Sequence, residues 1–352
     1  MPDDHRGRLK GMAMRLAAAV VLSLAISVAG AQAAPAPGRA REPIEVEIIK
    51  PRPFSTKKTP PIPVAWRSDL AAAKDEAARA GRCVLVFFHA DWSQPCRWMR
   101  DGTFASPVVA QTVNRRFLPV KVDDSQGTSP ITKEYEVRVY PTVLFLDPGG
   151  KPLHMVLGPR PPDKFAPLLD QVAELPTLMV ARKHKPNDLE ANFALGNAFA
   201  MLNQLKRAAP YLERAAELAP KNENGRLSQA RLILAVVPLE DGKSAEALEN
   251  IEAYLKQFKQ TPEVPVAIWY QGTILFQDGH LEEARAYFAK ILRQFPTHRK
   301  AYEADKAIEA IDARLKAKKA LEKKPSSPAL PPAEPSPPTR PPAAPRAPKP
   351  VG

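Results

Sequence analysis

Cysteine is scarce in this chain of 352 residues, which contains only Cys83 and Cys96. Two cysteines exclude a disulfide-rich scaffold, and no cysteine and histidine pairs have the spacing of a zinc site. The sequence also lacks a Ser/His/Asp arrangement and a glycine-rich loop that would hold a phosphate. We therefore predict neither a metal nor a cofactor.

Concentrated positive charge is also missing, although the net charge is +13. The 51 lysines and arginines are scattered along the chain, and no basic block is interleaved with aromatic residues. Such clustering is the usual mark of a nucleic-acid-binding surface. We therefore expect no nucleic-acid partner.

The N-terminus has an apolar run, residues 16–28, that is shorter than the roughly 20 residues needed to span a bilayer. Basic residues precede the run, and Ala31-Gln32-Ala33 follows it as an A-x-A cleavage site. The alternative is an uncleaved anchor, but the short run favours a signal peptide over residues 1–33, with Met14 as a second candidate start. The mature protein is expected to be secreted or periplasmic, in the cell envelope, without stable membrane insertion.

Half of the 40 prolines lie in two stretches, residues 34–63 and 321–352. We interpret the first as a linker, in which the alternating segment Ile44–Ile49 is compatible with one strand. The second has little apolar area to bury and is predicted to be a disordered or polyproline-like tail.

Residues 64–176 have the pattern of a small α/β domain with a central sheet and helices on both faces. Short apolar runs predict the strands, and helical patterns separate them. The expected strands are 83–88, 117–122, 142–146 and 153–157, and the expected helices are 69–80, 96–100, 107–115 and 162–174.

Residues 187–298 contain an internal repeat. Four pairs of residues match at one offset of 76 residues: Gly196 with Gly272, Ala208 with Ala284, Leu212 with Phe288, and Pro220 with Pro296. The small residues stand where paired helices approach closely, and the final proline ends the second helix. The spacing resembles the tetratricopeptide repeat, which implies an all-α helical array with a concave face for a protein partner.

The offset leaves room for three repeats, of which the middle one is degenerate because Pro238 falls where its first helix should continue. Residues 299–320 are predicted to form a charged helix that caps the stack.

A motif follows the first buried strand, where the chain reads Trp92-Ser93-Gln94-Pro95-Cys96 at the start of a helix. A second motif, Tyr140-Pro141-Thr142, precedes the third strand. Together they resemble the thioredoxin superfamily, whose W-C-x-P-C turn faces a loop with a cis-proline. The resemblance implies a thioredoxin-like fold over about residues 66–175 and a peptide-facing groove at these residues.

The sequence departs from this family at the nucleophile. Ser93 stands where the family has its first cysteine, and a hydroxyl cannot attack a disulfide. Cys96 matches the second, resolving cysteine, and Phe87 occupies the place of a buried acid that many members have.

Each of these residues has more than one interpretation. Ser93 is either the N-cap of the helix that carries Cys96 or a hydroxyl that hydrogen-bonds a bound thiolate. Cys96 is either a core thiol or a monothiol site. Cys83 is the first residue of the strand that precedes the motif, and Cys96 lies beyond the other end of that strand. At about 3.3 Å per residue the two cysteines are over 15 Å apart, whereas a disulfide needs Cα atoms within about 7 Å, so we predict no bond between them. His89 is expected to pack on Trp92, and Asp91 to face solvent.

Two functions remain open. The first is a protein-binding, scaffold or chaperone-like role in the cell envelope, redox-impaired by Ser93, with a protein or peptide partner bound by the repeat array and the groove. The alternative is a thiol–disulfide oxidoreductase that uses Cys96 alone.

Overall fold

The computed structural model describes residues 63–322 of the chain. The predicted signal peptide, the strand at Ile44–Ile49, nearly all of the linker and the proline-rich tail lie outside the described residues. Within residues 63–322, no helix combines the length and apolarity that crossing a membrane requires.

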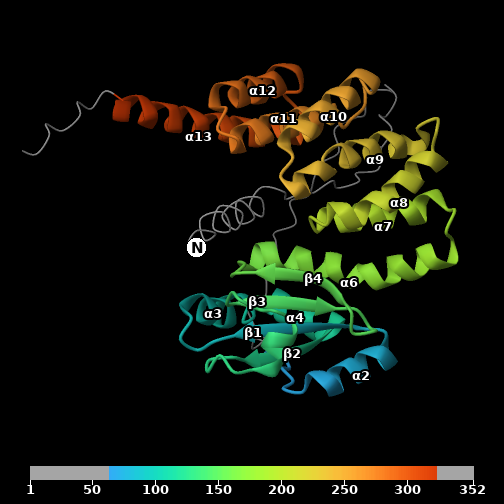
Figure 1. The fold of residues 1–352 in the computed structure, drawn as a ribbon, viewed down its shortest axis with the longest axis vertical. Coiled ribbons are helices and arrows are strands. Elements are labelled where there is room, and N and C mark those ends of the chain that lie inside the picture. The colour runs from blue at the N-terminus through green and yellow to red at the C-terminus, as the bar shows by residue number, and fades with distance from the viewer. Residues whose placement is uncertain (1–62, 323–352) are drawn as a thin grey trace, which may run out of the picture.

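A four-stranded mixed sheet forms the centre of the first domain (Figure 1). Its strand order is β2-β1-β3-β4, with β1 parallel to β2 and antiparallel to β3, and with β3 antiparallel to β4. Every residue of β1 is buried, as its continuous apolar run predicts. The strands are β1 (Cys83–His89), β2 (Phe117–Asp123), β3 (Thr142–Leu146) and β4 (Pro152–Leu157).

Helices cover both faces of this sheet, as predicted. Val84, Val86 and Phe88 of β1 face one core together with α2 (Leu70–Ala80), and α5 (Pro130–Glu134) borders the same side. Leu85 and Phe87 face the second core. The helices on that side are α3 (Gln94–Trp98), the π-helical turn η1 (Met99–Thr103), α4 (Pro107–Arg116) and α6 (Pro162–His184).

Helix α6 is longer than predicted, because it continues through Pro176 to His184. Its first half buries Phe165, Leu169 and Val172 against the sheet domain, and its second half packs on the helical array. Burial of both halves offsets the roughly 3 kcal/mol that a proline costs inside a helix. The helix therefore joins the two parts of the molecule, instead of ending at the predicted boundary near residue 176.

The second part is an all-α array of helix pairs (Figure 1). The first helix of the middle pair, α9, has 10 residues, and a 3-10 segment containing Pro238, η3 (Val237–Asp241), follows it, as the degenerate repeat predicts. Ala304 and Ile311 of the last helix are buried against the third pair. The helices are α7 (Leu189–Met201), α8 (Leu205–Leu218), α9 (Arg226–Ala235), α10 (Ser244–Gln257), α11 (Val264–Gln277), α12 (Leu281–Gln294) and α13 (Arg299–Glu322).

The array contacts the sheet domain at β4. Gln204 Nε2 donates to the carbonyl oxygen of Leu153 at 3.0 Å, and Arg207 donates to the same oxygen at 2.8 Å. Gln204 Nε2 also lies 2.9 Å from Nδ1 of His154. One hydrophobic core runs from the sheet through α6 and the first two helix pairs as far as α11, so the two parts pack as one unit.

Candidate functional site: the surface around Trp92

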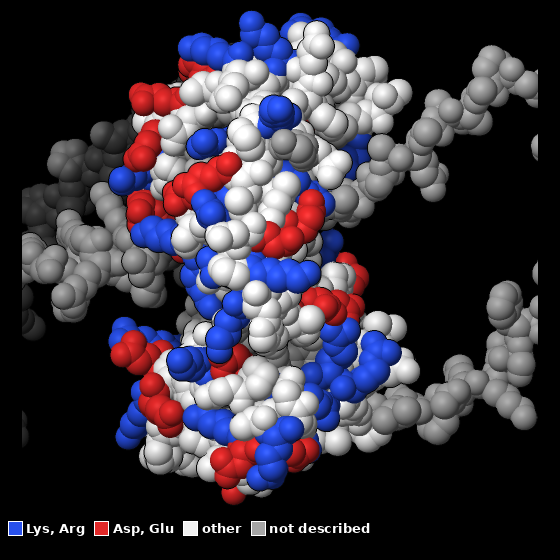
Figure 2. All heavy atoms as spheres, turned by 90° about the vertical axis from the view of Figure 1, so that its right-hand side faces the viewer, with Lys and Arg blue, Asp and Glu red and all other residues white. Residues whose placement is uncertain are grey.

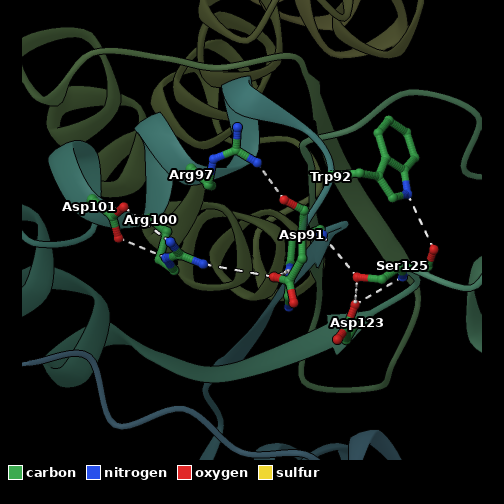
Figure 3. A network of polar contacts seen from close by, with 8 residues as sticks. Asp91, Trp92, Arg97, Arg100, Asp101, Asp123 and Ser125 are labelled. Carbon is green, nitrogen blue, oxygen red and sulfur yellow. Dashed lines mark hydrogen bonds and ion pairs between the residues drawn. The ribbon is translucent and has the colours of Figure 1, made fainter.

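The first motif lies on the turn between β1 and α3, and its tryptophan is exposed. Trp92 is 66% exposed and its Nε1 donates to the carbonyl oxygen of Ser125 at 3.2 Å (Figure 3). The backbone N–H of Asp91 donates to Ser125 Oγ at 2.8 Å. Asp91 faces solvent, as predicted. The turn after β1 is therefore held by the residues that follow β2.

A network of polar contacts extends from this turn (Figure 3). The Ser125 hydroxyl donates to Asp123, and this bond is the main cause that lowers the pKa of the Asp123 carboxyl. Arg97 donates to the carbonyl oxygen of Asp91, and Arg100 lies 3.8 Å from the Asp91 carboxylate. These contacts fix the backbone that presents Trp92.

Ser93 occupies the N-cap position of α3, but its side chain makes no capping hydrogen bond. Its carbonyl oxygen accepts from the N–H groups of Cys96 and Arg97, while its hydroxyl donates to the carbonyl oxygen of Tyr140 at 3.5 Å. The side chain is 5% exposed. The hydroxyl thus links the two motifs across the site, which neither interpretation from the sequence anticipated.

Both cysteines are buried and free. Cys96 is 3% exposed on α3. Cys83 is the first residue of β1, at the end of the strand away from the motif, and burial raises its pKa to about 12. Cys83 therefore behaves as a small apolar residue of the core.

The second motif faces the first. The Tyr140–Pro141 peptide bond is cis, and the Tyr140 ring meets Trp92 edge to face at 5.9 Å between centroids. Burial, followed by the hydrogen bond that its hydroxyl donates to Asp124, raises the pKa of Tyr140 to about 12. Thr142 Oγ1 donates to the carbonyl oxygen of Val139 at 2.7 Å, and Val139 is 44% exposed.

We call Trp92, Ser93, Val139, Tyr140 and Pro141 the motif surface. The structure brings both sequence motifs together there, with Gln94 and Pro95 exposed at its rim and Thr142 buried behind it. A flat, exposed indole that meets the Tyr140 ring suits an apolar side chain of a partner chain. Within residues 63–322, no cluster of potential metal ligands is present. Lysines and arginines are interspersed with acidic residues on the face of the molecule that Figure 2 shows.

The expectation that His89 packs on Trp92 is wrong. His89 is 4% exposed, is the last residue of β1, and stacks on Phe87 with 5.5 Å between ring centroids. Burial is the main cause that lowers the pKa of the imidazole. Strand β1 continues one residue further than predicted. Because side chains alternate between the two faces of a strand, His89 lies on the same face as Phe87.

Three residues of this region were missed by the sequence analysis: Asp123, Asp124 and Ser125. The available signal was their place at the carboxyl end of β2. Because β1 and β2 are parallel, their carboxyl ends meet at one edge of the sheet, and polar residues there come together.

Comparisons with known proteins match the sheet domain and the helical array separately. A thioredoxin-like family model matches residues 65–148, and a tetratricopeptide repeat model matches residues 179–223 and 234–299. An H-type thioredoxin of Oryza sativa is 31% identical over 101 residues, which are 28% of this chain and 75% of that protein. The chain therefore belongs to the thioredoxin family through its first domain, which tetratricopeptide repeats follow.

The thiol:disulfide interchange protein DsbD of Pseudomonas fluorescens is 30% identical over 100 residues, which are 28% of this chain. The chain spans only 16% of the length of that relative. The C-terminal domain of DsbD from Neisseria meningitidis, solved in its oxidised form, is 29% identical. The match covers 30% of this chain and 98% of that domain, with a TM-score of 0.26.

Proposed function

We propose that this protein is a binding factor that holds extended or unfolded protein segments, in a scaffold or chaperone-like role, and that it is impaired in dithiol chemistry. The observation that carries the proposal is the pairing of an exposed, fixed Trp92 with a serine at the family's nucleophile position. The surface that faces a substrate is present, whereas the attacking thiolate is replaced by a hydroxyl.

The contacts of Ser93 support the loss of chemistry. Its hydroxyl is buried and directed at the carbonyl oxygen of Tyr140, with no base within its hydrogen bonds. Cys96 is 3% exposed behind it. A bulky disulfide substrate has no exposed thiol to meet at this site, which disfavours the alternative of a monothiol oxidoreductase acting through Cys96.

The helical array supports a protein partner, since stacked helix pairs offer extended surfaces for other chains. Its contacts with β4 through Gln204 and Arg207 hold it against the domain that carries the motif surface. One partner that engages both parts therefore meets them in a fixed arrangement. We place this function in the cell envelope, on the signal-peptide pattern of residues 1–33.

Binding is tested with a probe that has no disulfide, the reduced and carboxymethylated B chain of insulin. We expect Trp92→Ala to weaken binding about tenfold or more, because exposed aromatic residues dominate such contacts. Trp98→Ala is the matched control, since Trp98 is 47% exposed on α3 but outside the motif surface. Equal effects of the two substitutions, or no binding by the wild type, would contradict a role for this surface.

Chemistry is tested separately by reduction of intact insulin with dithiothreitol as the electron donor. We expect no activity for the wild type above the uncatalysed rate and a gain for Ser93→Cys, which restores a dithiol. Activity in the wild type that Cys96→Ser abolishes would overturn the proposal and make Cys96 a working monothiol.

A further inference from the structure

The outer edge of β4 is the open edge of the described sheet. At the opposite edge, Arg67 pairs with β2, since its N–H donates to Pro119 and its carbonyl oxygen accepts from Lys121. At β4, the N–H of Gly158 donates to the carbonyl oxygen of Pro141. Within the described residues, no element pairs with the far side of β4.

The register of β3 and β4 shows which groups this edge presents. Gly158 and Val156 belong to the pairs that exchange hydrogen bonds with β3, because these pairs alternate along an antiparallel ladder. The backbone N–H and C=O groups of Met155 and Leu157 therefore point away from the sheet. The carbonyl oxygen of Leu153 is already bound by the helical array, so the free part of the edge is Met155–Leu157.

The two faces of this free edge differ in chemistry. Met155 and Leu157 are 39% and 48% exposed and lie on the same face, two residues apart. On the other face, His154 stacks on Phe145. Gln204 contacts His154 there, and Arg207 donates both to Gln204 and to the carbonyl oxygen of Leu153, so a guanidinium lies beside this face. A strand that fits here is apolar on one face and acidic on the other.

Residues 44–49 have that pattern. Ile44, Val46 and Ile48 alternate with Glu45 and Glu47, so a strand made of them has one aliphatic face and one face with two carboxylates. We propose that residues 44–49 of the same chain bind along the outer edge of β4 as a fifth strand. The aliphatic face then covers Met155 and Leu157, and the glutamates face Arg207.

The chain is long enough to make this contact. Asn114 Nδ2 donates to the carbonyl oxygen of Pro63, which places Pro63 beside the start of β2. Crossing from β2 to the outer side of β4 spans four strand spacings, about 19 Å. The 13 residues from 50 to 62 reach about 43 Å when extended. Pairing of this kind satisfies exposed backbone groups and blocks association of the edge with other chains.

The test is hydrogen exchange by NMR at the amides of Met155 and Leu157 in the full chain. We expect both amides to exchange about tenfold or more slowly than in the Val46→Asp variant, which places a charge on the aliphatic face. Ile49→Asp is the matched control, because residue 49 lies on the glutamate face and its substitution should leave the protection intact. The Gly158 amide, bound to Pro141, serves as an internal reference.

Other occupants give different results. Protection that rises with protein concentration and survives Val46→Asp indicates a second copy of the chain and overturns the proposal. Unprotected amides in the wild type also overturn it, and protection that then appears with an added peptide identifies the edge as a site for another protein. Equal loss of protection in Val46→Asp and Ile49→Asp refutes the assigned face of the strand.

Discussion

Gly196 is the residue at which the geometry of the helical array is most directly testable. It lies on α7 against α8, and a Cβ atom placed on it would stand 2.7 Å from Leu212 Cγ and 3.2 Å from the carbonyl oxygen of Ala208. Carbon atoms in contact prefer about 3.5–4.0 Å. Leu212 is 0% exposed, so its side chain can move aside only by displacing the residues packed around it. Gly196→Ala is therefore expected to force the two helices apart.

The size of the effect is the difference between two terms. Overpacking a core by one methyl group costs about 1–3 kcal/mol. Alanine in place of glycine inside a helix returns about 1 kcal/mol. We expect Gly196→Ala to lower the free energy of unfolding by about 1 kcal/mol. The loss is smaller if the Leu212 side chain can shift and larger if it cannot.

The assay is urea unfolding followed by circular dichroism at 222 nm. Gly102→Ala is the control, because a Cβ at Gly102 meets nothing within 4 Å and should leave stability unchanged or raise it. Leu212→Ala alone should cost about 2–5 kcal/mol. It should cost about 1 kcal/mol less in the Gly196→Ala background, where it removes the clash. If Gly196→Ala is as stable as Gly102→Ala, the close approach of α7 and α8 is wrong.

Three further predictions concern single residues of the sheet domain. Ser125→Ala removes the acceptor of the Asp91 N–H and should lower the free energy of unfolding by about 1 kcal/mol, with greater mobility of Trp92 in fluorescence anisotropy; unchanged anisotropy would argue against the network. Burial lowers the pKa of His154 to about 4 from 6.5, so the unfolded chain binds the extra proton and stability should fall as the pH drops from about 6.5 to 4. Gln204 Nε2 lies 2.9 Å from His154 Nδ1 and can only donate, so a proton on Nδ1 would bring two N–H donors face to face. His154→Gln should therefore flatten this part of the pH profile measured by thermal unfolding, and an identical profile would count against the contact. Cys83, whose pKa is raised to about 12, should resist iodoacetamide at pH 8 in the folded protein and react only on unfolding, as mass spectrometry would show; rapid labelling would place it outside the core.

Much of the fold was predictable from the sequence because its signals are local. A continuous apolar run such as residues 83–88 of β1 predicts a buried strand from six neighbouring residues. The offset of 76 residues relates Gly196 to Gly272, and both prove to face a bulky side chain of the second helix of their pair. The two thioredoxin motifs are likewise short stretches of sequence.

The tertiary structure decided the contacts that join distant parts of the chain. The Ser93 hydroxyl meets the carbonyl oxygen of Tyr140 across 47 residues, and the Asp91 N–H meets Ser125 across 34. The sequence determined which residues stand in each motif, including the serine in place of the cysteine. The hydrogen-bond partners of Ser93 and Trp92 depend on how β2 and the Tyr140–Pro141 loop are placed beside β1, and packing of the whole sheet determines that placement.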